Sequence, residues 1–186
     1  MFIQTERTPN PATLKFLPGR TVSVGDTVDF PDAESAERSP LAKALFSLGD
    51  VTRVFFGADF ITVTKAEGSA DWSELKPQIL GTIMQHFTSG APLLNEEAED
   101  AALADADDPA DEDIIIQIRE LLESRIRPAV ARDGGDIIYR GFRNGVVYLR
   151  MQGACAGCPS STATLKNGIE SLLKHYVPEV TEVRAV

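Results

Sequence analysis

The sequence predicts an α+β fold in which two small α+β domains are joined by an acidic, flexible linker. Residues 96–113 hold ten acidic residues and no basic one, and this run divides the 186-residue chain. Alternating runs typical of strands and amphipathic runs typical of helices occur on both sides of it, separated by Gly, Pro and Asn. We therefore expect domains at residues 1–90 and 113–186, with residues 91–112 as the linker.

The N-terminal domain is expected to open with two paired strands. Residues 2–7 and 13–17 are short extended runs. The turn between them, Thr8-Pro9-Asn10-Pro11, contains two prolines, which fix φ and remove backbone donors. A hairpin-like pair of strands follows from this arrangement.

A helix and a second hairpin come next. Ser39 and Pro40 offer an N-cap and a first-turn proline to a helix over residues 41–48. Residues 51–56 and 60–65 alternate in hydrophobicity around a Gly-Ala-Asp turn, which predicts an antiparallel pair of strands.

A long amphipathic helix closes this domain. Asp71 is its expected N-cap and Ser89 lies near its end, and five apolar residues at helical spacing should face the core: Leu75, Ile79, Ile83, Met84 and Phe87. His86 is not expected to bind metal, because residues 1–95 hold no cysteine and no second histidine. No nucleophile–base pair, phosphate loop or carboxylate dyad stands out, which leaves recognition as the expected role.

The C-terminal domain is expected to follow the order αββαβ, with a three-stranded sheet. A helix begins at Asp113, and Gly134 and Gly135 are able to end it. Two strands, residues 137–142 and 146–151, flank an Asn-Gly turn. A helix over residues 160–176 and a last strand over 180–186 follow. The first helix carries an apolar stripe made of Ile114, Ile118, Leu121, Leu122, Ile126 and Val130.

Charge and hydropathy exclude several classes of function. Residues 1–95 and 114–186 carry net charges of −3 and +3, too small to indicate a nucleic-acid partner. No stretch is apolar enough to span a membrane, and neither a signal peptide nor a transit segment is evident, so the cytoplasm is the expected compartment. The acidic run is expected to be a solvated spacer; its transient docking on the weakly basic C-terminal domain is the alternative.

The two cysteines of the chain both lie in one motif, Cys155-Ala156-Gly157-Cys158. Such a pair either exchanges electrons as a dithiol or presents half of a four-sulfur metal site. Pro159 is expected to be the first residue of the following helix, whose free N–H groups and dipole would favour the thiolate forms. The sequence therefore predicts thiolates available near neutral pH.

The number of ligands separates the possible uses of this motif. Iron–sulfur clusters and structural zinc require four protein ligands, and one chain offers two sulfurs, so a two-fold symmetric dimer would complete such a site. A thiol–disulfide oxidoreductase using Cys155 and Cys158 is the alternative, although the domain lacks the βαβ opening expected before a thioredoxin-like motif. A zinc site stays open as well.

The longer stretches around these motifs resemble a known family. Residues 133–162, with Asp133-Gly134-Gly135-Asp136 and Gly153-Ala154-Cys155-Ala156-Gly157-Cys158-Pro159, resemble the C-terminal domain of NifU-like (Nfu-type) iron–sulfur scaffold and carrier proteins. Residues 4–16, which include Thr8-Pro9-Asn10-Pro11, are similar to the N-terminal domain found with it. The resemblance covers nearly the whole chain except the acidic linker.

The resemblance implies a carrier and not an enzyme. It implies a 4Fe-4S cluster bridged across a homodimer by Cys155 and Cys158 of each chain, with a 2Fe-2S form left open, and transfer to apo iron–sulfur proteins. An upstream cluster-assembly machinery would supply the cluster, and the N-terminal domain would dock clients or partners. The compartment would be the bacterial cytoplasm, or the mitochondrial matrix in a eukaryote. Residues 133–136 are expected to turn the chain and not to bind metal.

Overall fold

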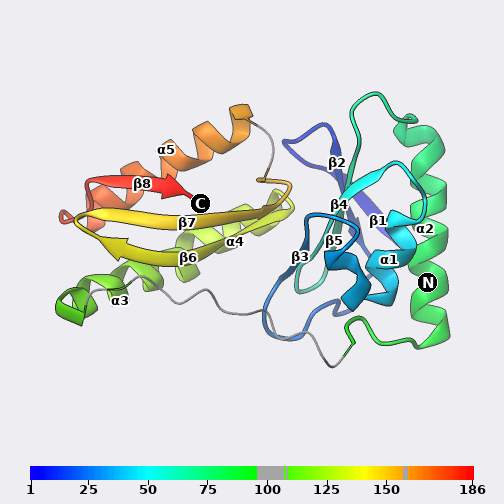
Figure 1. Ribbon diagram of the computed structural model, residues 1–186, viewed down its shortest axis with the longest axis horizontal. Coiled ribbons are helices and arrows are strands. Elements are labelled where there is room, and N and C mark those ends of the chain that lie inside the picture. The colour runs from blue at the N-terminus through cyan, green and yellow to red at the C-terminus, as the bar shows by residue number, and fades with distance from the viewer. Residues whose placement is uncertain (96–106, 108, 157–158) are drawn as a thin grey trace. The chain divides into compact units, whose positions relative to one another are not determined.

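The computed structural model describes residues 1–95, 107, 109–156 and 159–186, without the side chains of residues 109 and 159–161. It divides into two compact units, Met1–Asp100 and Ala101–Val186, each of which is treated by itself (Figure 1). Most of the acidic run, and with it the prediction of a flexible linker, lies outside the described residues, as does Cys158. Both units combine a sheet with helices, which confirms the predicted α+β class.

The first unit is built on a five-stranded antiparallel sheet with the order β1-β2-β5-β4-β3. The predicted strand pairs are confirmed: β1 (Gln4–Arg7) pairs with β2 (Thr13–Leu17), and β4 (Val51–Phe56) pairs with β5 (Ile61–Lys65). The edge strand β3 (Val28–Phe30) was not predicted, because three residues are too few to show an alternating pattern.

The helices of this unit begin and end largely where the sequence predicts. A short turn, η1 (Ser35–Arg38), precedes α1 (Pro40–Phe46), and the Ser39 hydroxyl caps α1 by accepting a hydrogen bond from the Ala42 amide at 3.1 Å. Asp71 occupies the N-cap position of α2 (Trp72–Ser89) without a side-chain cap bond, and Gly90 ends α2 in the left-handed region with φ 69°.

The core of the first unit lies between the sheet and these helices. It includes the fully buried residues Phe16, Phe30, Leu41, Leu45, Phe56, Ile61, Leu75, Ile79 and Ile83. The prediction that Met84 faces this core is wrong, since its side chain is 41% exposed. His86 is buried instead, because it follows Ile83 by three residues and so lies on the same helix face.

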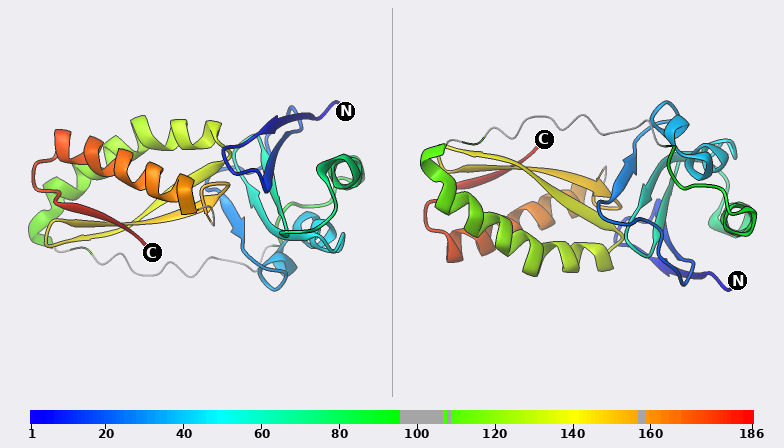
Figure 2. Two further views of the ribbon diagram at one scale, coloured as in Figure 1. Left: turned by 90° about the horizontal axis from the view of Figure 1, so that it is seen from above. Right: turned by 90° about the horizontal axis from the view of Figure 1, so that it is seen from below.

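The second unit follows the predicted αββαβ order (Figure 2). After η2 (Pro109–Asp111), the first helical segment comprises α3 (Glu112–Leu121), η3 (Leu122–Ile126) and α4 (Arg127–Arg132). The hairpin of β6 (Gly135–Arg143) and β7 (Val146–Gly153) turns at Asn144 and Gly145, both with positive φ.

The remaining helix of the second unit is a crossover connection. α5 (Pro159–Tyr176) leads from β7 to β8 (Glu182–Ala185), which pairs parallel to β7 and completes the sheet order β6-β7-β8. The apolar side chains of both helical segments and of the sheet form one core, with Ile118, Val147, Leu149, Leu173 and Val183 fully buried. The cysteine motif lies at the start of this crossover.

The first helical segment is interrupted by one wide turn that the sequence analysis did not predict. η3 is a π-helical turn, in which the Arg127 amide donates to the Leu122 carbonyl, five residues back. Pro128 explains it, because a proline in a helix has no N–H to donate and its ring clashes with the carbonyl four residues earlier. The widened turn precedes Arg127, whose side chain acts near the cysteine motif.

None of the helices in the part of the chain that the structure describes is long and apolar enough to cross a membrane.

We predict that acid weakens the first unit through His86. Its Nε2 atom is buried without a hydrogen-bond partner among the described residues, and burial lowers the pKa of this imidazole below 6.5. The unfolded chain then binds more protons, so the stabilisation is complete above about pH 6.5 and is lost as the pH falls toward the native pKa. The loss stays within about 1.4 kcal/mol per pH unit, the limit for one proton.

Urea unfolding between about pH 7.5 and 5.5, followed by the fluorescence of the single tryptophan, Trp72, measures this effect. His86→Leu should flatten the pH dependence of the Trp72 transition. His175→Leu, which removes the other histidine of the chain from the second unit, should leave it unchanged. A His86→Leu profile parallel to that of the unsubstituted protein would contradict the role given to His86.

Candidate functional site

The described part of the cysteine motif lies where β7 ends and the chain turns toward α5. Gly153 has φ 65°, and the Ala156 amide donates to its carbonyl at 3.1 Å, which closes a tight turn. The Ala154 amide donates to the Gly134 carbonyl at 3.1 Å, so the turn is attached to the segment that leads into β6. Thr162 of α5 donates its hydroxyl to the Cys155 carbonyl at 3.0 Å.

Cys155 is buried, with 6% of its surface exposed, and its side chain belongs to the core of the second unit. It packs directly on Gly135: a Cβ atom at that position would lie 2.6 Å from Cys155 Sγ and 2.7 Å from the Gln152 carbonyl oxygen. Only glycine therefore allows the sulfur to lie here. The second cysteine of the predicted pair, Cys158, lies outside the described residues, so the structure does not test whether the two thiols meet.

The two glycines before β6 have different roles. Gly134 has φ 82° and ends the helical segment as predicted. The role of Gly135 as the surface on which Cys155 packs was missed by the sequence analysis. Gly135 pairs with Gly153 across β6 and β7, and two glycines at opposed positions beside a cysteine were the available signal for a close approach.

The prediction of a thiolate near neutral pH is wrong for Cys155 in this structure. Burial, with a further contribution from the nearby carboxylates of Asp133 and Asp136, raises its pKa to about 12. The effect of a helix N-terminus falls off within about one turn. Cys155 lies four positions before Pro159, the first residue of α5, and so gains little from that effect.

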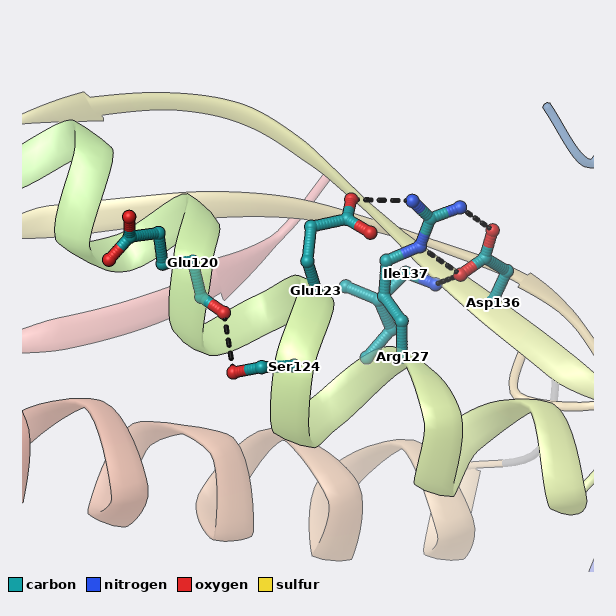
Figure 3. Close-up of polar contacts among 6 residues, drawn as sticks. All are labelled: Glu120, Glu123, Ser124, Arg127, Asp136 and Ile137. Atoms are coloured by element: carbon teal, nitrogen blue, oxygen red, sulfur yellow. Dashed lines mark hydrogen bonds and ion pairs between the residues drawn. The ribbon is translucent and has the colours of Figure 1, made fainter. Parts of the chain in front are cut away.

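An ion pair holds the start of β6, next to the glycine on which Cys155 packs (Figure 3). Arg127 binds both carboxylate oxygens of Asp136, with Nε–Oδ1 and Nη2–Oδ2 distances of 2.8 and 2.7 Å, and donates a third bond to Glu123 at 2.6 Å. The Ile137 amide also donates to Asp136 at 2.8 Å. These contacts raise the pKa of Arg127, so the guanidinium stays charged.

Asp136 is therefore a structural carboxylate, in agreement with the expectation that residues 133–136 turn the chain. It is 3% exposed, and both of its oxygens are bound by Arg127. Within the described ranges, no group of three or more His, Cys, Asp and Glu side chains is placed to hold a metal ion.

The first unit offers a groove beside its proline-containing turn. It has a volume of about 640 Å³ and lies between the end of β1, the Thr8-Pro9-Asn10-Pro11 turn and the first turn of α2. The Trp72 indole donates to the Pro11 carbonyl at 3.1 Å, and the Asn10 side chain accepts from the Ala12 amide at 3.0 Å. These hydrogen bonds attach the turn to α2, and the groove beside it is a candidate recognition surface of this unit.

Two family descriptions match the two units separately. "Scaffold protein Nfu/NifU N terminal" matches residues 3–90, and "NifU-like domain" matches residues 118–184. The second match contains the cysteine motif, and the first contains the groove-forming turn.

Relatives of known description match over the full length of this chain. The human "NFU1 iron-sulfur cluster scaffold homolog, mitochondrial" is 52% identical over 186 residues, and the protein of the same description from Drosophila ananassae is 51% identical over 187. The chain spans 72% of the human protein and 64% of the fly protein. The NMR structure of a NifU-like protein from Saccharomyces cerevisiae matches 52% of this chain and 87% of its own, with 24% identity and a TM-score of 0.47.

Both halves of the chain, and the chain as a whole, thus match one kind of protein. The chain belongs to the NFU1 family of iron–sulfur cluster scaffold proteins, and its role is that of a scaffold and not of an enzyme.

Proposed function

We propose that this protein carries a 4Fe-4S cluster, held between two copies of the chain by Cys155 and Cys158 of each, and passes it to apo iron–sulfur proteins. The observation that carries the proposal is the cysteine pair itself. The chain holds two cysteines, both in one Cys-Ala-Gly-Cys motif within the part that matches the NifU-like domain. Two thiolates are half of what such a cluster requires, so a second copy must supply the rest.

Cargo binding requires Cys155 to leave its buried position. In the cluster-free chain its sulfur packs on Gly135 and its thiol is protonated at neutral pH, whereas a metal ligand must be a thiolate. We infer that the turn over residues 153–156 has a closed form, in which Cys155 is stored, and an open form, in which it binds cargo. The Thr162–Cys155 hydrogen bond and the contact with Gly135 are the interactions that opening must break.

The closed form argues against the alternative of a thiol–disulfide oxidoreductase. Such an enzyme needs an accessible cysteine with a lowered pKa as its nucleophile. Cys155 is buried, and its pKa is raised to about 12. A carrier can tolerate a stored thiol because its cargo selects the open form, whereas a catalyst would lose rate at every turnover.

The two units divide the work of transfer. The domain at residues 1–90 would dock clients or partners, with its groove as the recognition surface, and residues 91–112 would tether it to the cluster-bearing domain at 113–186. Donation by an upstream cluster-assembly machinery would load the carrier, and a 2Fe-2S form is a second possible cargo. A reducing compartment suits free thiols, either the cytoplasm or the mitochondrial matrix, and the printed name of the human relative says mitochondrial.

Anaerobic reconstitution with iron and sulfide tests the cargo and its stoichiometry. We predict a brown dimer that contains about four irons per two chains, because four cysteine ligands complete one cluster. Cys155→Ser and Cys158→Ser should each abolish both the colour and the dimer. Iron analysis and sedimentation measure the two properties. A colourless monomer after reconstitution, or a serine variant that still dimerises around iron, would overturn the proposal.

The stored position of Cys155 can be tested without any cluster. In a Cys158→Ser background, we predict that Gly135→Ala raises the rate of Cys155 alkylation at least about tenfold, because the added Cβ would lie 2.6 Å from Cys155 Sγ and favours the open turn. Gly168→Ala is the matched control, since a Cβ there meets no atom within 4 Å. Equal alkylation rates in the two variants, with folded spectra, would contradict the closed form.

The docking role of the first unit predicts selective defects in transfer. A chain that begins at residue 101 should still bind its cluster, because the cysteine motif lies in the second unit. It should transfer the cluster more slowly to some apo-acceptors than the full chain does. Transfer rates to a panel of acceptors measure this, and Trp72→Ala in the full chain tests the groove itself. Unchanged rates for every acceptor would remove the docking role.

A further inference from the structure

One carboxylate of the acidic run, that of Asp107, is bound by three donors of the second unit. Asp107 Oδ1 accepts a hydrogen bond from the Tyr139 hydroxyl at 2.6 Å and another from the Phe142 amide at 3.3 Å. Asp107 Oδ2 pairs with Arg119 Nη2 at 3.3 Å. The Arg119 guanidinium in turn lies over the Tyr139 ring, 4.6 Å from its centre. Three donors of different kinds, from α3 and β6, therefore converge on one side chain.

The Asp107 site lies at the open edge of the three-stranded sheet. β6 is an edge strand of the sheet, since the order of strands is β6-β7-β8. The Phe142 amide donates to Asp107, so this N–H points away from β7 toward the open edge. Unpaired N–H groups at a sheet edge are templates for pairing with another chain. Asp107 accepts the hydrogen bond of one such N–H group with its charged carboxylate.

The site is at the end of the β6–β7 hairpin opposite to the cysteine turn. Phe142 pairs with Val147 next to the Asn144–Gly145 turn, whereas Gly135 pairs with Gly153 beside Cys155. Phe142 follows Gly135 by seven residue steps along the strand, which corresponds to about 23 Å. Dimerisation at this edge and dimerisation around the cysteine turn would therefore use different ends of the domain.

We propose that Arg119, Tyr139 and the Phe142 amide form a carboxylate site, and that Asp107 fills it to fasten the end of the acidic segment over the edge of β6. Here the three donors are called the carboxylate clip. The clip has two consequences. It fixes the chain at residue 107, before the start of α3, and it keeps copies of the chain from pairing through β6. Association is then left to the cysteine end.

Amide hydrogen exchange tests the clip directly. The measurement uses the full chain with Cys155→Ser and Cys158→Ser, so its outcome does not depend on cluster binding. We expect Asp107→Ala to speed exchange of the Phe142 amide about tenfold, the ratio that one charge-assisted hydrogen bond is worth. Tyr139→Phe should have a smaller effect in the same direction, because it leaves the ion pair and the Phe142 bond in place.

Asp111→Ala is the matched control. Asp111 is an acidic residue at the N-cap of α3 that makes no side-chain cap bond, and its loss should leave Phe142 exchange unchanged. If Phe142 exchanges at the same rate in the Asp107→Ala variant and in its parent, the clip does not exist. If the Asp111 variant speeds exchange as much as the Asp107 variant does, the effect is one of general charge and the clip is likewise refuted.

Sedimentation of the same variants tests the second consequence. The Asp107→Ala variant should associate with increasing concentration, whereas the parent and the Asp111→Ala variant should stay monomeric. A variant that lacks Asp107 and stays monomeric at all concentrations would show that the clip does not protect this edge.

Discussion

The contact between Cys155 Sγ and Gly135 is the constraint on which the second unit depends. The sulfur can lie against the start of β6 only because Gly135 has no Cβ. The turn after β7 is held to the same place by the bond from the Ala154 amide to the Gly134 carbonyl. The ion pair of Arg127 and Asp136 fixes this start of β6 from the other side. Cys155 is therefore packed as part of the core of this unit and is not displayed at the surface.

This packing changes how the thiol chemistry is controlled. A helix N-terminus next to a cysteine suggests an activated sulfur, but burial and two nearby carboxylates outweigh that effect for Cys155 and keep it protonated. A protonated, buried thiol reacts slowly with oxidants and disulfides. The Cys155 thiol is thus protected in this structure, and exposing it requires breaking its contact with Gly135 and the hydrogen bond from Thr162 to its carbonyl.

Most of the fold could be predicted from local sequence signals, because a few neighbouring residues determine each turn and helix cap. Asn144 and Gly145 mark a hairpin, and Ser39 marks a helix start, without reference to anything distant. What failed depends on distant contacts. The burial of Cys155 and the role of Gly135 arise where three segments meet, and the exposure of Met84 depends on which helix face the sheet covers. Neither is visible in a local pattern.

The wide turn before Arg127 also explains the spacing of the apolar residues in the first helical segment of the second unit. The buried residues Ile118, Leu122, Ile126 and Val130 recur every four positions. In a regular α-helix each such step rotates the side chain by about 40°, so the fourth residue would have moved off the face. A π-helical turn contains one more residue than an α-helical turn, so it rotates the following side chains back toward the buried face. In this chain, four-residue spacing of the buried residues with a proline inside it, Pro128 between Ile126 and Val130, accompanies the widened helix turn.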